Sequence, residues 1–178
     1  MAFALALRRA RRIDLDALAT LWHTVWDESH RPLVPAALLP HRDRDSFRKR
    51  LSRKLDHCVV CDMPCGDIAG FAMVGDSELE QLFVGSAARG PAAGLSLGLL
   101  RAAEAELAFR GAATAHLFAL ANNARAVRFY EKSGWSRGDA RVNHVEIENG
   151  TFPLDCYRFE RRLPPAAEIR GERILAGT

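Results

Sequence analysis

Between residues 78 and 135, the 178-residue sequence alternates strand-like and helix-like segments in an order that restricts how the chain can fold. Strands are predicted over 78–84 and 115–120. A helix is predicted over 94–110, because leucine and alanine recur there at helical spacing. Two strands joined through a helix form a right-handed crossover, which packs one helix face against the sheet. The sequence therefore predicts a mixed α/β domain built around this unit.

The other predicted elements complete the order β α α β β β α β α β β. Further strands are expected over 3–9, 58–63, 68–74, 141–148 and 156–162, and the N-caps of the other helices are Asp14, Asp45 or Ser46, and Asn122 or Asn123. The last of these helices ends at Gly134. We expect a single domain over 1–163, with a mixed central sheet of about seven strands flanked by four helices, and a mobile tail over 164–178.

Composition and charge argue against several classes of protein. Hydrophobic residues make up 48% and charged residues 26%, as in an ordinary globular chain, and apolar runs are too short to span a membrane. The net charge of +3 is too small to indicate a dedicated nucleic-acid binder. The apolar start over 1–7 precedes its arginines, which is the wrong order for a secretory signal. We therefore expect a cytoplasmic protein that binds neither membrane nor nucleic acid.

The four cysteines predict neither disulfides nor a metal site. Cys58, Cys61 and Cys65 are clustered, whereas Cys156 is distant. Disulfides are not expected without a secretory signal. The Cys-x-x-Cys spacing can indicate zinc, but no second pair of ligands follows it. We interpret the cluster as buried strand thiols followed by an exposed cysteine in a turn.

The turn over 88–94 is suited to binding an anion. Its small residues allow a ligand to approach the backbone, and the unsatisfied amides at the start of the next helix carry partial positive charge. The turn lacks the Gly-Lys-Ser/Thr of a P-loop and the Gly-x-Gly-x-x-Gly of a dinucleotide site. Taken alone, it is equally compatible with an ordinary tight turn.

Residues 123–135 carry a more specific pattern, Asn-Ala-Arg-Ala-Val-Arg-Phe-Tyr-Glu-Lys-Ser-Gly-Trp. Together with the preceding strand, turn, helix and strand, this pattern closely resembles the GNAT acyl-CoA-dependent N-acetyltransferases. The resemblance covers nearly the whole chain in element order. It implies the GNAT fold, acetyl-CoA as cosubstrate, and transfer of the acetyl group to a primary amine of a small molecule, peptide or protein.

The resemblance also implies which residues hold the cosubstrate. The pyrophosphate would lie on the helix start formed by Arg89, Gly90, Pro91, Ala92, Ala93, Gly94 and Leu95. The pantetheine arm would pair with the main chain of Leu82, Phe83 and Val84, and Asn123 would contact the same arm. Ala92 replaces a usual glycine and Pro91 has no N–H, so we expect acetyl-CoA binding to survive but to be weaker than is usual in the family.

Three residues are candidates for the chemistry. The resemblance implies that Tyr130, which lies beside the cofactor, is the general acid that protonates the departing thiolate; the alternative is a structural tyrosine. Glu78 stands where many family members have a carboxylate base. Glu80, two residues later in the strand, points to the same face, so the two could share the work; alternatively, they lie at an exposed strand end.

The acceptor would enter from the opposite side of the sheet. Trp26, His30 and His144 are the candidate substrate-binding residues. Asp27 and Glu28 could hold a cationic amine or could simply form a solvated helix end. The last two strands offer edges through which a homodimer could form.

Three functions are compatible with these residues. The first is an acetyl-CoA-dependent N-acetyltransferase in which an amine attacks the thioester directly. The second is a CoA-binding sensor or regulatory module with little turnover. The third is a structural domain of the same fold that binds no ligand.

Overall fold

The computed structural model describes residues 6–88 and 94–165. Its main elements, in chain order, are β1 (Ala6–Arg9), α1 (Leu15–Ser29), α2 (Arg44–Lys54), β2 (Cys58–Asp62), β3 (Ile68–Val74), β4 (Leu79–Val84), α3 (Gly94–Phe109), β5 (Thr114–Leu120), α4 (Ala124–Lys132), β6 (Ser136–Ile147) and β7 (Gly150–Arg162). Short 3-10 turns, Arg31–Leu33 and Ala36–His41, occupy the proline-rich segment between α1 and α2. No helix in the described ranges is long and apolar enough to cross a membrane.

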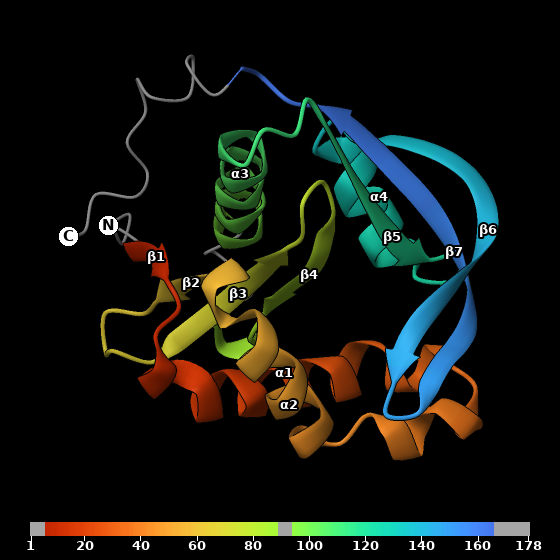
Figure 1. The fold of residues 1–178 in the computed structure, drawn as a ribbon, viewed down its shortest axis with the longest axis horizontal. Coiled ribbons are helices and arrows are strands. Elements are labelled where there is room, and N and C mark those ends of the chain that lie inside the picture. The colour runs from red at the N-terminus through yellow and green to blue at the C-terminus, as the bar shows by residue number, and fades with distance from the viewer. Residues whose placement is uncertain (1–5, 89–93, 166–178) are drawn as a thin grey trace.

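The predicted fold class is confirmed, but the seven strands form two sheets. Strands β1-β2-β3-β4 make one antiparallel sheet, and β5-β7-β6 make the other. A parallel bridge between Glu78 and His116 joins β4 to β5, supported by a 2.9 Å hydrogen bond from the His116 amide to the Ser77 carbonyl. Beyond this bridge the two strands separate (Figure 1).

Helices cover both faces of the first sheet. Figure 1 shows α1 and α2 on one face and α3 on the other, while the long β6–β7 hairpin reaches towards the segment between α1 and α2. Trp22, Phe47, Phe71 and Phe83 form an aromatic core under α1 and α2, and hydrophobic residues of the hairpin pack against it. The hairpin and the first two helices therefore enclose a space on one side of β4.

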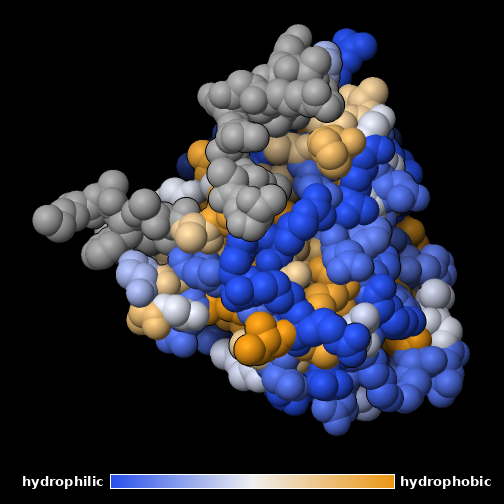
Figure 2. All heavy atoms as spheres, turned by 60° about the vertical axis from the view of Figure 1, so that its left-hand side comes forward, coloured by the Kyte–Doolittle hydropathy of each residue, from blue (hydrophilic) through white to orange (hydrophobic). Residues whose placement is uncertain are grey.

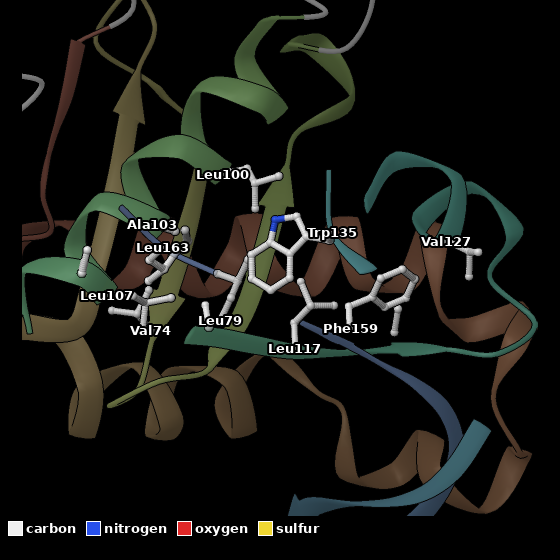
Figure 3. Packing of buried hydrophobic residues seen from close by; sticks show 14 residues of the cluster. Val74, Leu79, Leu100, Ala103, Leu107, Leu117, Val127, Trp135, Phe159 and Leu163 are labelled. Atoms are coloured by element: carbon white, nitrogen blue, oxygen red, sulfur yellow. The ribbon is translucent and has the colours of Figure 1, made fainter. Parts of the chain in front are cut away.

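A second core lies under α3 and α4. Leu79, Leu100, Leu117, Trp135 and Phe159 belong to this cluster, which joins the two sheets (Figure 3). It fixes the position of β4 relative to β5 near their bridge. The surface shown in Figure 2 is mostly hydrophilic with small separate hydrophobic patches.

Local signals determine where α4 begins and ends. The Asn123 side chain accepts a 3.1 Å hydrogen bond from the Ala126 amide, so Asn123 is the N-cap, as predicted. At the other end, Gly134 has a φ of 85°, a conformation that glycine adopts at little cost. The amides of Gly134 and Trp135 donate to the carbonyls of Glu131 and Tyr130, which closes the helix in a Schellman motif.

Three predicted boundaries were wrong. The N-cap of α2 is Asp43, whose carboxylate accepts from the Ser46 amide at 2.7 Å, rather than Asp45 or Ser46. Strand β6 starts five residues before the predicted 141, and β7 starts six residues before the predicted 156. Pro153 is accommodated inside β7 because β5 ends opposite Cys156, which leaves β7 with one strand neighbour at that point in the described chain.

Candidate active site

A pocket of about 450 Å³ opens where β4 and β5 separate. Beyond Glu78, β4 pairs with β3 alone, and β5 pairs with β7 alone, so the two facing strand edges have no partner strand in the described chain. The pocket is lined by Trp22, Trp26, His30, Val34, Leu38, Arg42, Phe47, Arg50, Lys54, Glu78, Leu79, Glu80, Gln81, Leu82, Phe83, Phe118, Ala119, Leu120, Asn123, Ala126, Tyr130, Asn143, His144, Val145, Glu146, Leu154 and Cys156. Residues from both sheets, α1, α2, α4 and the β6–β7 hairpin therefore meet in one cavity.

A β-bulge in β4 shapes the carboxylate side of the pocket. Met73 lies opposite Gln81 and Val74 lies opposite Leu79, so Glu80 is an extra residue without an opposite partner. A bulge interrupts the alternation of side chains and turns one of them to a new direction. Here the carboxylate of Glu80 turns towards α2 and bonds the Lys54 ammonium at 2.5 Å.

Glu78 lies in a different electrostatic environment from Glu80. Among the described residues, Glu78 pairs with His116, with 3.6 Å between Glu78 Oε2 and His116 Nε2. Burial lowers the pKa of His116, so its ring is neutral at pH 7. Burial and the neighbouring Glu80 raise the pKa of Glu78. The carboxylate of Glu78 is thus available to accept a proton, whereas that of Glu80 is held by a cation.

Tyr130 lies across the pocket on α4. Its ring packs against Phe129, Trp135 and Phe159 at centroid distances of 5.2, 6.2 and 5.6 Å. No described residue is hydrogen-bonded to its hydroxyl, and burial raises the pKa of Tyr130, so the phenol is protonated at neutral pH. Packing holds the ring in place, and the hydroxyl remains free to bond a molecule in the pocket.

The described cofactor candidates do not all reach the pocket. Leu82, Phe83 and Asn123 line it. Asn123 uses its side-chain oxygen for the helix cap, which leaves its Nδ2 group without a partner among the described residues. Val84 is buried opposite Gly70 in the sheet.

The remaining cofactor candidates belong to the turn and the start of α3. Gly94 is exposed at the first residue of α3, and Leu95 is buried in the core beneath that helix. The other members, Arg89, Gly90, Pro91, Ala92 and Ala93, lie outside the described residues. The pyrophosphate site therefore stays a prediction.

The three acceptor candidates meet in the pocket. Trp26 and His30 come from the end of α1, and their rings stack at a centroid distance of 6.0 Å, while His144 comes from β6. Burial lowers the pKa of His30 to about 4, so its imidazole is neutral at pH 7. Asp27 instead pairs with Arg31 at 2.5 Å, and neither Asp27 nor Glu28 lines the pocket.

Sequence reasoning missed the basic residues of the acceptor side. Arg42, Arg50 and Lys54 all line the pocket, together with the acidic Glu146. Lys54, the last residue of α2, bonds the Glu80 carboxylate. Arg50 follows the buried Phe47 by three residues, which places it on the inward stripe of α2; this spacing could have revealed it.

The cysteines behave as interpreted from the sequence. Cys58 and Cys61 are buried in β2, Cys65 is exposed in the following turn, and Cys156 is buried in β7. Burial raises the pKa of Cys58 to about 12 and those of Cys61 and Cys156 to about 11, so these three remain thiols at neutral pH.

Known proteins share both the sequence pattern and the fold. A family model described as an acetyltransferase (GNAT) domain matches residues 31–148, which is more than half of the chain. A search of curated proteins found no significant match.

Solved structures agree with the family match. A GCN5-related N-acetyltransferase from Rhodopseudomonas palustris is 22% identical, with a TM-score of 0.69 over 89% of this chain and 96% of the other. The PaiA N-acetyltransferase of Thermoplasma acidophilum in complex with coenzyme A is 15% identical, with a TM-score of 0.64 over 90% and 99%. A putative acetyltransferase, YncA, from Salmonella typhimurium with acetyl-CoA is 19% identical, with a TM-score of 0.65 over 90% and 94%. The chain therefore belongs to the GNAT acetyltransferase family, whose members use acetyl-CoA as cosubstrate.

Proposed function

We propose that this protein is an N-acetyltransferase in which a primary amine attacks the thioester of acetyl-CoA directly. One observation carries the proposal: a single pocket contains both Glu78, whose carboxylate forms no ion pair with a lysine or arginine of the described residues, and Tyr130, whose hydroxyl has no hydrogen-bond partner among them. Direct transfer needs a group that takes a proton from the amine and a group that returns one to the thiolate.

The residues present fit acetyl-CoA. The open edge of β4 offers main-chain groups of Leu82 and Phe83 to an extended pantetheine arm, in the manner of an added strand. Asn123 Nδ2 offers a further donor on the opposite wall of the pocket. A β4 amide on this open edge would also stabilise the negative charge that develops on the thioester oxygen.

Glu78 is the proposed base. A primary amine with a pKa of about 10 is mostly protonated at neutral pH, so it must lose a proton before it attacks. A raised pKa makes Glu78 a stronger base than an ordinary carboxylate. Glu80 is less suited, since protonation would break its 2.5 Å ion pair with Lys54.

Tyr130 is the proposed acid. Its raised pKa keeps the phenol protonated until it is needed. Transfer to a thiolate with a reference pKa of about 8.5 is uphill, at a cost of about 1.4 kcal/mol for each pKa unit. Burial also raises the pKa of a thiol, so the enclosed pocket reduces that difference.

The test is an acetyl-transfer assay with a panel of primary amines. Release of free CoA is followed through its thiol, and mass spectrometry identifies acetylated products. We expect transfer to at least one amine, and a strong loss of transfer in the Glu78→Gln variant. Saturable acetyl-CoA binding with no product across the panel would contradict the proposal and favour a sensor or regulatory module.

A further inference from the structure

The acceptor side of the pocket contains an arginine, Arg42, that forms no ion pair with any residue the structure describes. Arg42 is only 5% exposed, yet no carboxylate of the described residues lies within 4.0 Å of its guanidinium. The hydrogen bond found for this side chain runs from Nη1 to the His41 carbonyl at 3.0 Å. A guanidinium carries five N–H donors, so most of those on Arg42 are unused in the described structure.

A second arginine, Arg50, lines the same pocket, and its charge acts on Arg42. Arg50 stacks over the Trp22 ring, with its Cζ 4.9 Å from the ring centroid, and its Nε is 3.7 Å from Glu146 Oε2. Glu146 bonds Arg53 more closely, at 2.5 Å, so this one carboxylate is shared by Arg50 and Arg53. Burial lowers the pKa of Arg42 to about 10, and the positive charge of Arg50 adds to this effect, whereas the Glu146 carboxylate opposes it.

Cations therefore outnumber their fixed partners on this side of the pocket. Lys54 is matched by Glu80, and Glu146 is shared, which leaves Arg42 unmatched. An unpaired buried charge is costly, so natural proteins rarely keep one without a partner. Guanidinium groups bind carboxylates through two parallel hydrogen bonds, and this geometry favours arginine over lysine wherever a carboxylate is recognised.

We propose that the acceptor carries a carboxylate as well as its amine, and that Arg42, assisted by Arg50, binds that carboxylate. This inference rests on the proposed function, because it names the class of amine that the site acetylates. Free amino acids belong to this class. Acceptors without an acidic group would leave Arg42 unpaired and are expected to react poorly.

The test compares matched acceptors that differ only in the carboxylate. Each free L-amino acid is assayed beside its α-amide, and kcat/KM is measured for both. Amidation also changes the reactivity of the amine, but this change cancels when the acid-to-amide ratio of a variant is divided by that of the unmodified enzyme. For acidic amino acids, side-chain amides tell which of the two carboxylates is bound.

We expect the acid-to-amide ratio to fall by about 30-fold or more in Arg42→Gln, because truncating one side of a buried charge pair has large effects. Arg42→Lys keeps the charge without the forked geometry, so its acid-to-amide ratio should lie between those of the wild type and Arg42→Gln. Arg50→Gln should show a smaller decrease, since Glu146 already shares that charge. Arg48→Gln is the matched control, because Arg48 is exposed on the same helix and pairs with Asp16 at 2.8 Å outside the pocket.

The outcomes separate this proposal from the proposed function. The carboxylate site would be overturned if kcat/KM were as high for amides as for acids and Arg42→Gln did not change their ratio. The proposed acetyltransferase activity would still stand in that case. If no amine is acetylated, the same acids and amides are titrated calorimetrically in the presence of CoA. Binding of acids alone would then support the carboxylate site without turnover, and binding of neither would overturn it. Circular dichroism and acetyl-CoA affinity confirm that each variant is folded.

Discussion

The two halves of the pocket are lined by different kinds of chemical groups. The half between β4, β5 and α4 offers open strand edges, small side chains such as Ala119 and Ala126, and a single phenol, Tyr130. The half under α1, α2 and the hairpin is crowded with charged side chains, among them Arg42 and Arg50. The first half offers main-chain groups on open strand edges, and these groups are the same whatever side chain stands at each position. The second half depends on individual side chains, so it can differ in specificity while the fold stays the same.

Glu78 lies where the two halves meet, and its loss should have the largest effect. We expect Glu78→Gln to lower kcat/KM by about 10²–10⁴-fold, the usual range for removing a general base, while acetyl-CoA affinity stays within about twofold. Steady-state kinetics and calorimetry measure the two quantities. Glu80→Gln is the matched control, and an equal loss in both variants would show that the two carboxylates share the role.

Loss of the Tyr130 hydroxyl should have a smaller effect. Tyr130→Phe keeps the ring contacts with Phe129, Trp135 and Phe159, so the fold and acetyl-CoA affinity should persist. We expect kcat to fall by about 10- to 100-fold, because a thiolate leaves more readily than most groups without prior protonation. An unchanged kcat in the Phe variant would mean that the ring is structural and that water protonates the thiolate.

The raised pKa of Glu78 predicts how activity depends on pH. Because the base must be ionised, kcat/KM should fall about tenfold per pH unit as the pH drops below the pKa of Glu78, which burial and Glu80 raise above the usual value for a glutamate. Glu78→Gln should abolish this inflection. Because the pKa of Glu78 is higher in the folded than in the unfolded state, the free energy of unfolding falls as the pH rises from the unfolded-state pKa through the folded-state pKa. Glu78→Gln removes this loss, so the Tm of the variant should improve relative to wild type over that pH interval. A profile unchanged by the substitution would assign the inflection to another group.

Asn123 offers the smallest and most selective test, because its two side-chain atoms serve different ends. Asn123→Ala should lose about 1 kcal/mol of stability with the helix cap, and acetyl-CoA affinity with the free Nδ2. Asn123→Asp keeps an oxygen for the cap, so it should retain stability but lose affinity. Thermal denaturation measures the change in stability and calorimetry the change in acetyl-CoA affinity. Equal affinity in the wild type and both variants would show that Asn123 does not bind acetyl-CoA.

The position of α4 in the first half was predictable from sequence because its signals are local. Asn123 and Gly134 mark the ends of one short helix, and they fix where Tyr130 lies within a span of 12 residues. The residues of the acceptor half are far apart in the sequence, and their contacts depend on tertiary packing. Arg42 follows a proline-rich turn with no periodicity, so nothing in its neighbourhood predicts that it is buried.

The predicted boundaries of β6 and β7 were wrong for a related reason. Most of β6 is exposed and polar, so the alternation that identifies a half-buried strand is missing. Pro153 normally argues against a strand, and the sequence gives no sign that β7 has lost one neighbour there. The separation of β4 from β5, which creates the pocket, is likewise a property of how two sheets pack and not of either strand.

The most direct measurement is a calorimetric titration of acetyl-CoA into the wild type, Asn123→Asp and Arg42→Gln proteins. The two-half account predicts saturable one-to-one binding by the wild type, weaker binding by Asn123→Asp and unchanged affinity in Arg42→Gln. Free acetyl-CoA at about 100 times its Kd should also raise the free energy of unfolding by about 2.7 kcal/mol. Absence of saturation at millimolar acetyl-CoA, or a Kd that changes with Arg42 and not with Asn123, would contradict the account.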